Sequence, residues 1–131
     1  MTLKKRQNTI KALIRRGDGV LFVKDPKDVW ELPGGRIIKG ETPARALTRE
    51  LKEELCFDNV KIGNIVHRFS FVSKVTPIEY DVTVYECFTD EDVILQTEEA
   101  KEYRWINFSG INNLNTRDGY KRALQQYFFV H

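Results

Sequence analysis

The most constraining feature of the chain is a glycine pair followed closely by a segment in which acidic residues recur at short intervals. Gly34 and Gly35 follow the segment Trp30-Glu31-Leu32-Pro33, and from Gly35 to Glu54 the sequence reads G-x5-E-x7-R-E-L-x-E-E. A glycine-rich turn lets the backbone approach a ligand closely. Clustered carboxylates supply the oxygen ligands that Mg²⁺ takes in company with substrate phosphates. The pattern therefore indicates metal-dependent chemistry on phosphates.

The acidic segment has the signals of a helix. Thr42 is a good N-cap, and Pro43 suits the first helical position, where its missing N–H is not needed. Residues 44–55 contain no glycine or proline and are dominated by strong helix formers. The apolar positions recur at three- and four-residue spacings, which predicts one face packed on a sheet. This predicted face consists of Ala44, Leu47, Leu51 and Leu55.

Three glutamates lie close together on this predicted helix. Glu50, Glu53 and Glu54 are related as i, i+3 and i+4, so they share a face within about one turn. Such like charges repel one another, and a divalent cation removes the conflict. Arg49 precedes Glu53 by four residues and is placed to hold a carboxylate. A helix of this composition alone would be read as a salt-bridged surface, but the glycine pair and Glu41 favour a metal site.

The segment resembles the Nudix box of the Nudix hydrolase family, whose pattern is G-x5-E-x7-R-E-U-x-E-E-x-G-U, with U a bulky apolar residue. Every fixed position from Gly35 to Glu54 matches, and Leu51 and Phe57 supply the first and last apolar positions. The resemblance implies an enzyme with an α/β/α sandwich fold. It also implies that the box acids coordinate Mg²⁺ or Mn²⁺.

One position departs from the family pattern. Cys56 stands where the family has glycine, at the end of the helix, where a left-handed backbone conformation is common. If Cys56 adopts that conformation, the cost is about 1 kcal/mol. Alternatively the turn shifts toward Asp58 or Asn59, which tolerate positive φ better. No carboxylate is lost in either case.

The resemblance assigns roles to several residues. Glu50, Glu53, Glu54 and the backbone carbonyl of Gly34 would hold the metal. One of the box acids, such as Glu53 or Glu50, or a later loop acid would act as the base. Arg49 is included among the catalytic residues because it would hold a carboxylate in place, and Glu41 would brace the loop.

The later loop acid is predicted at Glu99. Many family members carry an acid in the loop before a strand that contains tryptophan, and Glu99 precedes Trp105 by six residues. We expect Glu99 to serve as a further ligand or base. The alternative is that residues 97–102 form an ordinary solvated acidic loop.

Substrate contacts are expected beside the glycine pair and on aromatic side chains. Gly35, Arg36 and Lys39 are the candidates for binding phosphate, with an ordinary surface charge as the alternative for the two cations. Aromatic faces suit nucleobases. Trp30, Phe71 and Tyr80 are the candidates for stacking on a base.

The remainder of the chain predicts strands and a terminal helix. Alternation and β-branched or aromatic content predict strands, and apolar residues from Thr116 onward keep helical spacing. The expected fold is an α/β sandwich: a mixed sheet with a helix on each face, in one domain over residues 1–131. The predicted strands cover residues 9–15, 20–24, 29–32, 60–75, 78–88 and 103–106.

Composition restricts the partners. The chain has 41% hydrophobic residues and a net charge of +2, which gives no electrostatic case for binding long nucleic acid. Two cysteines do not make a disulfide framework, no apolar run approaches the roughly 20 residues that span a bilayer, and the N-terminus lacks a secretory signal. We therefore expect a cytoplasmic protein, monomeric or homodimeric, that acts on a small nucleotide.

The resemblance implies a Mg²⁺-dependent pyrophosphohydrolase that cleaves the diphosphate of a nucleoside diphosphate linked to a group X, or of a nucleoside triphosphate. A second hypothesis is a catalytically silent, nucleotide-binding or regulatory Nudix-like module, which typically has lost box acids, whereas none is lost here. A third is a factor that processes RNA ends, against which the near-neutral charge argues.

Overall fold

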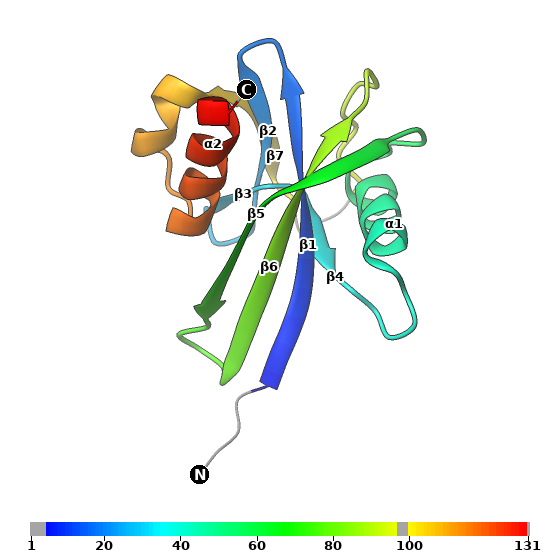
Figure 1. Ribbon diagram of the computed structural model, residues 1–131, viewed down its shortest axis with the longest axis vertical. Coiled ribbons are helices and arrows are strands. Elements are labelled where there is room, and N and C mark those ends of the chain that lie inside the picture. The colour runs from blue at the N-terminus through cyan, green and yellow to red at the C-terminus, as the bar shows by residue number, and fades with distance from the viewer. Residues whose placement is uncertain (1–4, 97–99, 131) are drawn as a thin grey trace.

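β1 (Lys5–Arg16) is the strand around which the sheet is built (Figure 1). The computed structural model describes residues 5–96 and 100–130. The helices are α1 (Pro43–Leu55), α2 (Asp118–Val130) and the short 3₁₀ helix η1 (Phe108–Asn113). The remaining strands are β2 (Gly19–Lys24), β3 (Trp30–Glu31), β4 (Gly34–Arg36), β5 (Lys61–Val72), β6 (Ile78–Phe88) and β7 (Glu102–Asn107).

The seven strands form one mixed sheet. Its main order is β3-β2-β1-β6-β5, with β4 also paired to β1 and β7 to β2. The β1–β6 pair is parallel, and the other pairs are antiparallel. A parallel neighbour requires a long crossover, and here the segment between β1 and β6 contains α1. The predicted mixed α/β architecture is confirmed.

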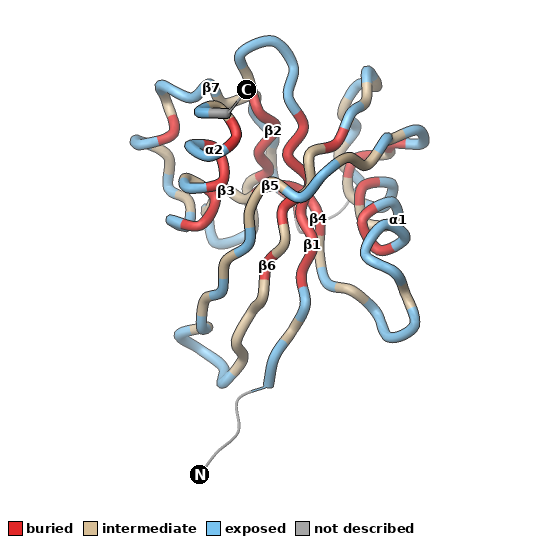
Figure 2. The backbone as a smooth tube through the Cα atoms, in the orientation of Figure 1, coloured by how far each residue is buried: buried red, intermediate tan, exposed pale blue. Residues whose placement is uncertain are grey.

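A helix covers each side of the sheet, and each has its own core (Figure 2). α1 buries Ala46, Leu47, Leu51 and Leu55 in a cluster with Ile10, Ala12 and Ile14 of β1. α2 buries Tyr120, Ala123, Leu124 and Tyr127 in a cluster with Leu13 of β1 and Val82 and Val84 of β6. Successive side chains of a strand point to opposite faces, which is why β1 contributes to both cores.

The predicted apolar face of α1 is correct except at its start. Ala44 lies in the first turn and is exposed, whereas Ala46 is fully buried. In β1, Lys11 and Arg15 both alternate with the apolar residues Ile10, Ala12 and Ile14, yet they differ in burial. Arg15 is exposed, but Lys11 retains only 8% of its accessible surface. Lys11 shares the α2-side face with Leu13, so its surroundings are set by a helix that follows about a hundred residues later in the chain.

Cys56 ends α1 in the left-handed conformation that family members give to glycine. Its φ and ψ are 59° and 29°, and its backbone N–H donates to the carbonyls of Leu51 and Lys52. The first of the two sequence alternatives is therefore correct, and the turn does not shift to Asp58 or Asn59. The helix therefore ends where the family pattern predicts, but with a non-glycine residue in the left-handed region of φ and ψ, which L-residues avoid.

Replacing Cys56 with glycine is expected to stabilise the protein by about 0.5–1 kcal/mol, because relief of the positive-φ strain exceeds the added entropy of the unfolded chain. Urea denaturation of both proteins measures the change. Cys56→Ala keeps a Cβ and is the matched control, expected to show no gain. Equal stabilities for the glycine and alanine variants would contradict the strain argument.

No helix in the described part of the chain is both long and apolar enough to cross a membrane.

Candidate active site

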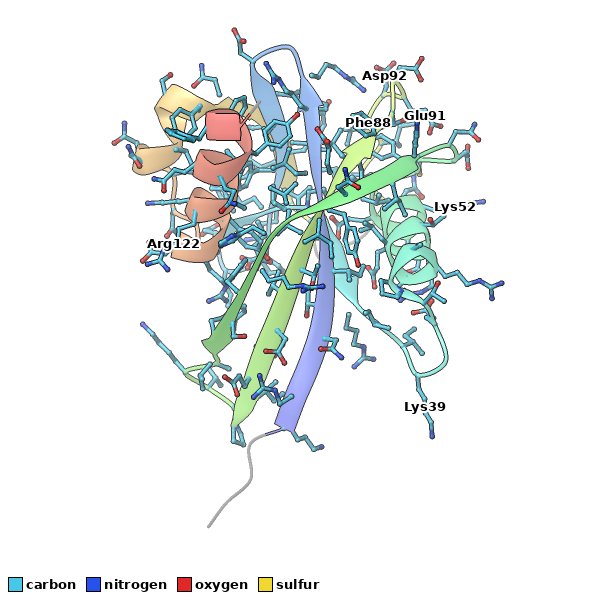
Figure 3. The ribbon with its side chains drawn as sticks, in the orientation of Figure 1. Lys39, Lys52, Phe88, Glu91, Asp92 and Arg122 are labelled. Atoms are coloured by element: carbon cyan, nitrogen blue, oxygen red, sulfur yellow. The ribbon has the colours of Figure 1, made fainter. Side chains whose placement is uncertain are left out.

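A cavity of about 390 Å³ lies between β4 and α1. It brings together most of the residues that the sequence singled out. Its lining consists of Gly34, Gly35, Arg36, Ile38, Arg49, Glu50, Glu53 and Glu54. Lys39 does not line it, and its side chain extends outward from the loop before α1 (Figure 3). Glu99 lies outside the described residues.

Gly34 and Gly35 both lie so close to neighbouring atoms that a side chain would not fit at either position. Gly34 has a φ of 139°, and a Cβ added there would collide with the carbonyl oxygen of Ile10 in β1. At Gly35 the space that a Cβ would fill is taken by the carboxylate of Glu50, both of whose oxygens would lie 2.6 Å from that atom. The glycine pair thus seats β4 against β1 and leaves a cradle for Glu50.

Arg49 holds the acidic cluster together. Its Nε and Nη2 donate to the two carboxylate oxygens of Glu41 at 2.7 and 2.9 Å. Its Nη1 donates to Glu50 at 3.0 Å and to Glu53 at 3.2 Å, and Nη2 also reaches the carbonyl of Arg36 at 3.1 Å. The predicted Arg49–Glu53 pair is present, but the bidentate partner is Glu41, on the loop before the helix. A planar guanidinium suits such a fork, and the bond fixes the loop against α1.

Glu41 is held in its ionised form by these contacts. The hydrogen bonds from Arg49, with that from the backbone N–H of Ile38, lower the pKa of Glu41 to about 2. Because Glu41 is already bonded to Arg49 and to Ile38, it braces the site from the side.

Glu41 predicts a specific dependence of stability on pH. Its pKa is about 2 in the folded protein and ordinarily 4.5, so its ionised form favours folding above pH 4.5, and this contribution is lost as pH falls toward 2. Glu41→Gln is therefore expected to be less stable than wild type near neutral pH. The difference should shrink as the pH is lowered through this window, measured by urea denaturation. A difference that stays constant with pH would show that the negative charge of Glu41 does not stabilise the fold.

Glu53 and Glu54 complete the face of α1. The side chain of Glu53 is 56% exposed, whereas Glu54 is half-buried and one of its carboxylate oxygens is buried. The backbone carbonyl of Glu54 accepts from the N–H of Gln96 at 3.2 Å, and that of Leu55 accepts from Ile94 at 3.1 Å. These bonds hold the segment that precedes residues 97–99 against the C-terminal end of α1.

The residues present fit a divalent metal by their chemistry. Carboxylates and a backbone carbonyl are the hard oxygen donors that Mg²⁺ and Mn²⁺ take. The cradle at Gly35 places the Glu50 carboxylate against the backbone of β4, and Gly34 is buried beside it. Within residues 5–96 and 100–130 no three acidic, histidine or cysteine side chains converge into a ready-made cage. The hydrogen bonds that Arg49 donates to Glu50 and Glu53 would compete with a metal ion for these carboxylates.

A second and larger cavity, of about 920 Å³, forms a groove on the α2 side of the sheet. Phe71 and Tyr80 line it, with ring centroids 5.0 Å apart, and the guanidinium of Arg117 lies 3.9 Å from the centroid of Phe71. The expected stacking role of Trp30 is not supported, because Trp30 is 5% exposed and does not line the groove. The other two stacking candidates, Phe71 and Tyr80, do line it, and the ring of Phe69 lies beside that of Phe71.

Sequence reasoning missed several polar residues of this groove. Lys11, Glu31, Arg117 and Tyr120 line it from β1, β3 and the region that begins α2. Their only common sequence signal is a position beside recognised elements, such as Glu31 next to Trp30. Lys11 interrupts the apolar run of residues 10–14, and that interruption is a sequence signal that could have indicated the groove.

Comparisons with known proteins show the family of the chain. A family model described as "NUDIX domain" matches residues 5–127. The chain belongs to the Nudix family. An RNA pyrophosphohydrolase of Gluconobacter oxydans is 32% identical, over 95% of this chain and 83% of that protein. An 8-oxo-dGTP diphosphatase of Proteus vulgaris is 42% identical over a shorter stretch, 30% of this chain and 38% of that one.

Solved structures share the fold of this Nudix hydrolase. A MutT protein from Methanosarcina mazei Go1 superposes with a TM-score of 0.85 over 97% of this chain and 96% of that one, at 20% identity. A MutT NUDIX hydrolase from Burkholderia pseudomallei gives 0.78 over 94% and 98% of the two chains, also at 20% identity. At such identities the likeness shows the fold alone. The family, rather than these structures, shows that the protein is a hydrolase.

Proposed function

We propose that this Nudix hydrolase cleaves the diphosphate linkage of a nucleotide, a nucleoside triphosphate or nucleoside diphosphate-X, with Mg²⁺ or Mn²⁺ as cofactor. The observation that carries the proposal is the seat of the Glu50 carboxylate against Gly35, with Arg49 holding Glu41, Glu50 and Glu53 around it. The aromatic groove adds a place for a planar base. Lys11 lines that groove and pairs in the sheet with Gly34, so the groove and the acidic cavity adjoin.

In this proposal Glu50, Glu53, Glu54 and the carbonyl of Gly34 would hold the metal. When bound, the metal would offset phosphate charge and acidify water. Glu53, Glu50 or Glu99 would accept the proton of the attacking water, and among the described residues Glu53 is the more exposed. Arg49 acts as a positioning residue that fixes the carboxylates.

The phosphates lie against the glycine pair. Gly35 permits close approach of the backbone, and the exposed Arg36, which also lines the acidic cavity, provides a positive charge. Lys39 shares a neighbouring hollow with Arg36, Lys5 and Arg6. It can reach only the part of a substrate that extends beyond the cleaved linkage.

Nucleoside triphosphates are the favoured substrates. The names of the relatives, RNA pyrophosphohydrolase and 8-oxo-dGTP diphosphatase, both describe release of diphosphate. A net charge of +2 favours the small substrate over long nucleic acid. The triphosphate end of RNA is the second candidate, because the hollow with four basic side chains continues from the active site. A catalytically silent module is disfavoured, because the box keeps all its acids.

The test is a hydrolysis assay on nucleoside triphosphates, nucleotide sugars, dinucleoside polyphosphates and a 5′-triphosphate RNA, with Mg²⁺, with Mn²⁺ and with a chelator. We expect metal-dependent release of nucleoside monophosphate with pyrophosphate or X-phosphate. A mock preparation without the protein measures contaminating phosphatase. Tight nucleotide binding without turnover would support the regulatory module, and no metal-dependent cleavage of any substrate would refute the proposal.

A further inference from the structure

Lys11 is a buried charge in the floor of the aromatic groove. It is 8% exposed, lines the groove, and is hydrogen-bonded with the hydroxyl of Tyr120. The ammonium group of a lysine has three N–H donors, so one bond to Tyr120 leaves further N–H groups for a ligand.

Glu31 supplies an acceptor in the same groove. Its side chain is 22% exposed, and its Oε1 lies 3.6 Å from Nε of Arg117. Arg117 in turn stacks on Phe71, which restrains it beside the carboxylate. A carboxylate accepts hydrogen bonds and cannot donate, whereas an ammonium only donates. The groove thus offers an ammonium donor and a carboxylate acceptor beside the aromatic rings of Phe69, Phe71 and Tyr80.

A planar base that lies in this groove presents its edge to such groups. Guanine presents a keto oxygen, O6, beside N–H donors at N1 and N2. Adenine and cytosine present an amino donor where guanine has O6, and a ring nitrogen acceptor where guanine has N1–H. Placed in this groove, their amino group would face the ammonium and their ring nitrogen the carboxylate, so both positions would be mismatched.

We propose that the groove selects bases with a keto oxygen beside a ring N–H, guanine above all, with Lys11 donating to the keto oxygen and Glu31 accepting from the ring N–H. Uracil offers the same pair but lacks the second donor, the N2 amine, that Glu31 accepts from guanine. This inference rests on the proposed function, since it names the base of that same nucleotide substrate.

The wild-type enzyme is tested by kcat/KM for GTP, UTP, ATP and CTP with Mg²⁺. We expect GTP to be the best, UTP to follow, and the GTP to ATP ratio to be about ten- to a hundredfold, as for a good two-bond base contact. A preference for ATP or CTP, or no preference, would overturn the proposal.

Two variants separate the donor from the acceptor. Lys11→Met removes the ammonium and is expected to bring the GTP to ATP ratio toward one, mainly by raising the KM for GTP. Glu31→Gln introduces an amide N–H that can donate to N1 of adenine, so it lowers the ratio by improving ATP. If Lys11→Met does not fold, Glu31→Gln still decides. Lys52→Met is the matched control, because Lys52 points to solvent from α1 with 70% of its side chain exposed (Figure 3), and its ratio should equal that of wild type.

Equal losses for GTP and ATP in Lys11→Met would overturn the proposal and place Lys11 against a phosphate. If the wild type hydrolyses no triphosphate, the proposed function fails, and the base preference is then decided by calorimetric titration with GMP and AMP. Tighter binding of GMP by about tenfold or more, lost in the variants, supports the inference. Equal binding, or none, overturns it.

Discussion

Glutamine in place of Glu54 is expected to lower kcat by about a thousandfold, within the range that a positioned acid–base or metal-binding carboxylate contributes. The substitution keeps the shape of the side chain and removes its charge. Glu54 lies on the inner part of the cluster, half-buried and with one carboxylate oxygen shielded from water, so solvent cannot replace that charge. Steady-state assays with Mg²⁺ on the best nucleoside triphosphate measure the loss.

Glu102→Gln on β7 is the matched control. Glu102 lies 3.5 Å from Lys24 and 3.6 Å from Arg104 in a surface network, with 42% of its side chain exposed. Its substitution makes the same chemical change away from the acidic cavity and should leave kcat unchanged. Urea denaturation should show that both variants are folded and as stable as wild type. If Glu54→Gln then retained a third or more of the wild-type rate, Glu54 would not belong to the catalytic cluster.

The sequence predicted α1 well because its signals are local. The Thr42 cap, which accepts from the N–H of Arg45 at 3.2 Å, and the apolar spacing of Leu47, Leu51 and Leu55 all lie within a few turns. The bounds of β6 also coincide with the prediction, because its alternation is uninterrupted.

The strand that carries the glycine pair could not be predicted. β4 is only three residues long, two of them glycine, and glycine has no strand propensity. It exists because Gly34 and Gly35 pair with Lys11 and Ile10 of β1, which is a contact between distant segments. β1 likewise begins earlier than predicted, at Lys5, because its first residues pair with β6.

The two parts of the site differ in the same way. The spacing of Glu50, Glu53 and Glu54 on one helix is a property of the local sequence. The bidentate bond of Arg49 to Glu41 depends instead on how the preceding loop folds back. The floor of the groove depends on α2, which covers the face of β1 that carries Lys11 and Leu13. Patterns within one element cannot show which of its faces a distant helix will bury.

Alanine in place of Gly35 is expected to lower kcat by about a hundredfold, because displacing one catalytic carboxylate by an ångström is enough for such a loss. The added Cβ would occupy the position of the Glu50 carboxylate. α1 is anchored by Leu47 and Leu51, both fully buried, so the helix cannot retreat, and the Glu50 side chain must rotate instead. That rotation breaks its 3.0 Å bond to Arg49.

Gly17→Ala is the contrasting control. Nothing lies within 4 Å of a Cβ there, but Gly17 has a φ of 60°. This variant should therefore lose about 1 kcal/mol of stability and no activity. Gly35→Ala should instead lose activity and keep its stability. The double variant Gly35→Ala/Glu50→Asp should recover part of the rate, because the shorter acid leaves room for the methyl group. Wild-type kcat in Gly35→Ala would mean that the position of Glu50 beside β4 has no part in catalysis, and the geometric basis of the proposed mechanism would fail with it.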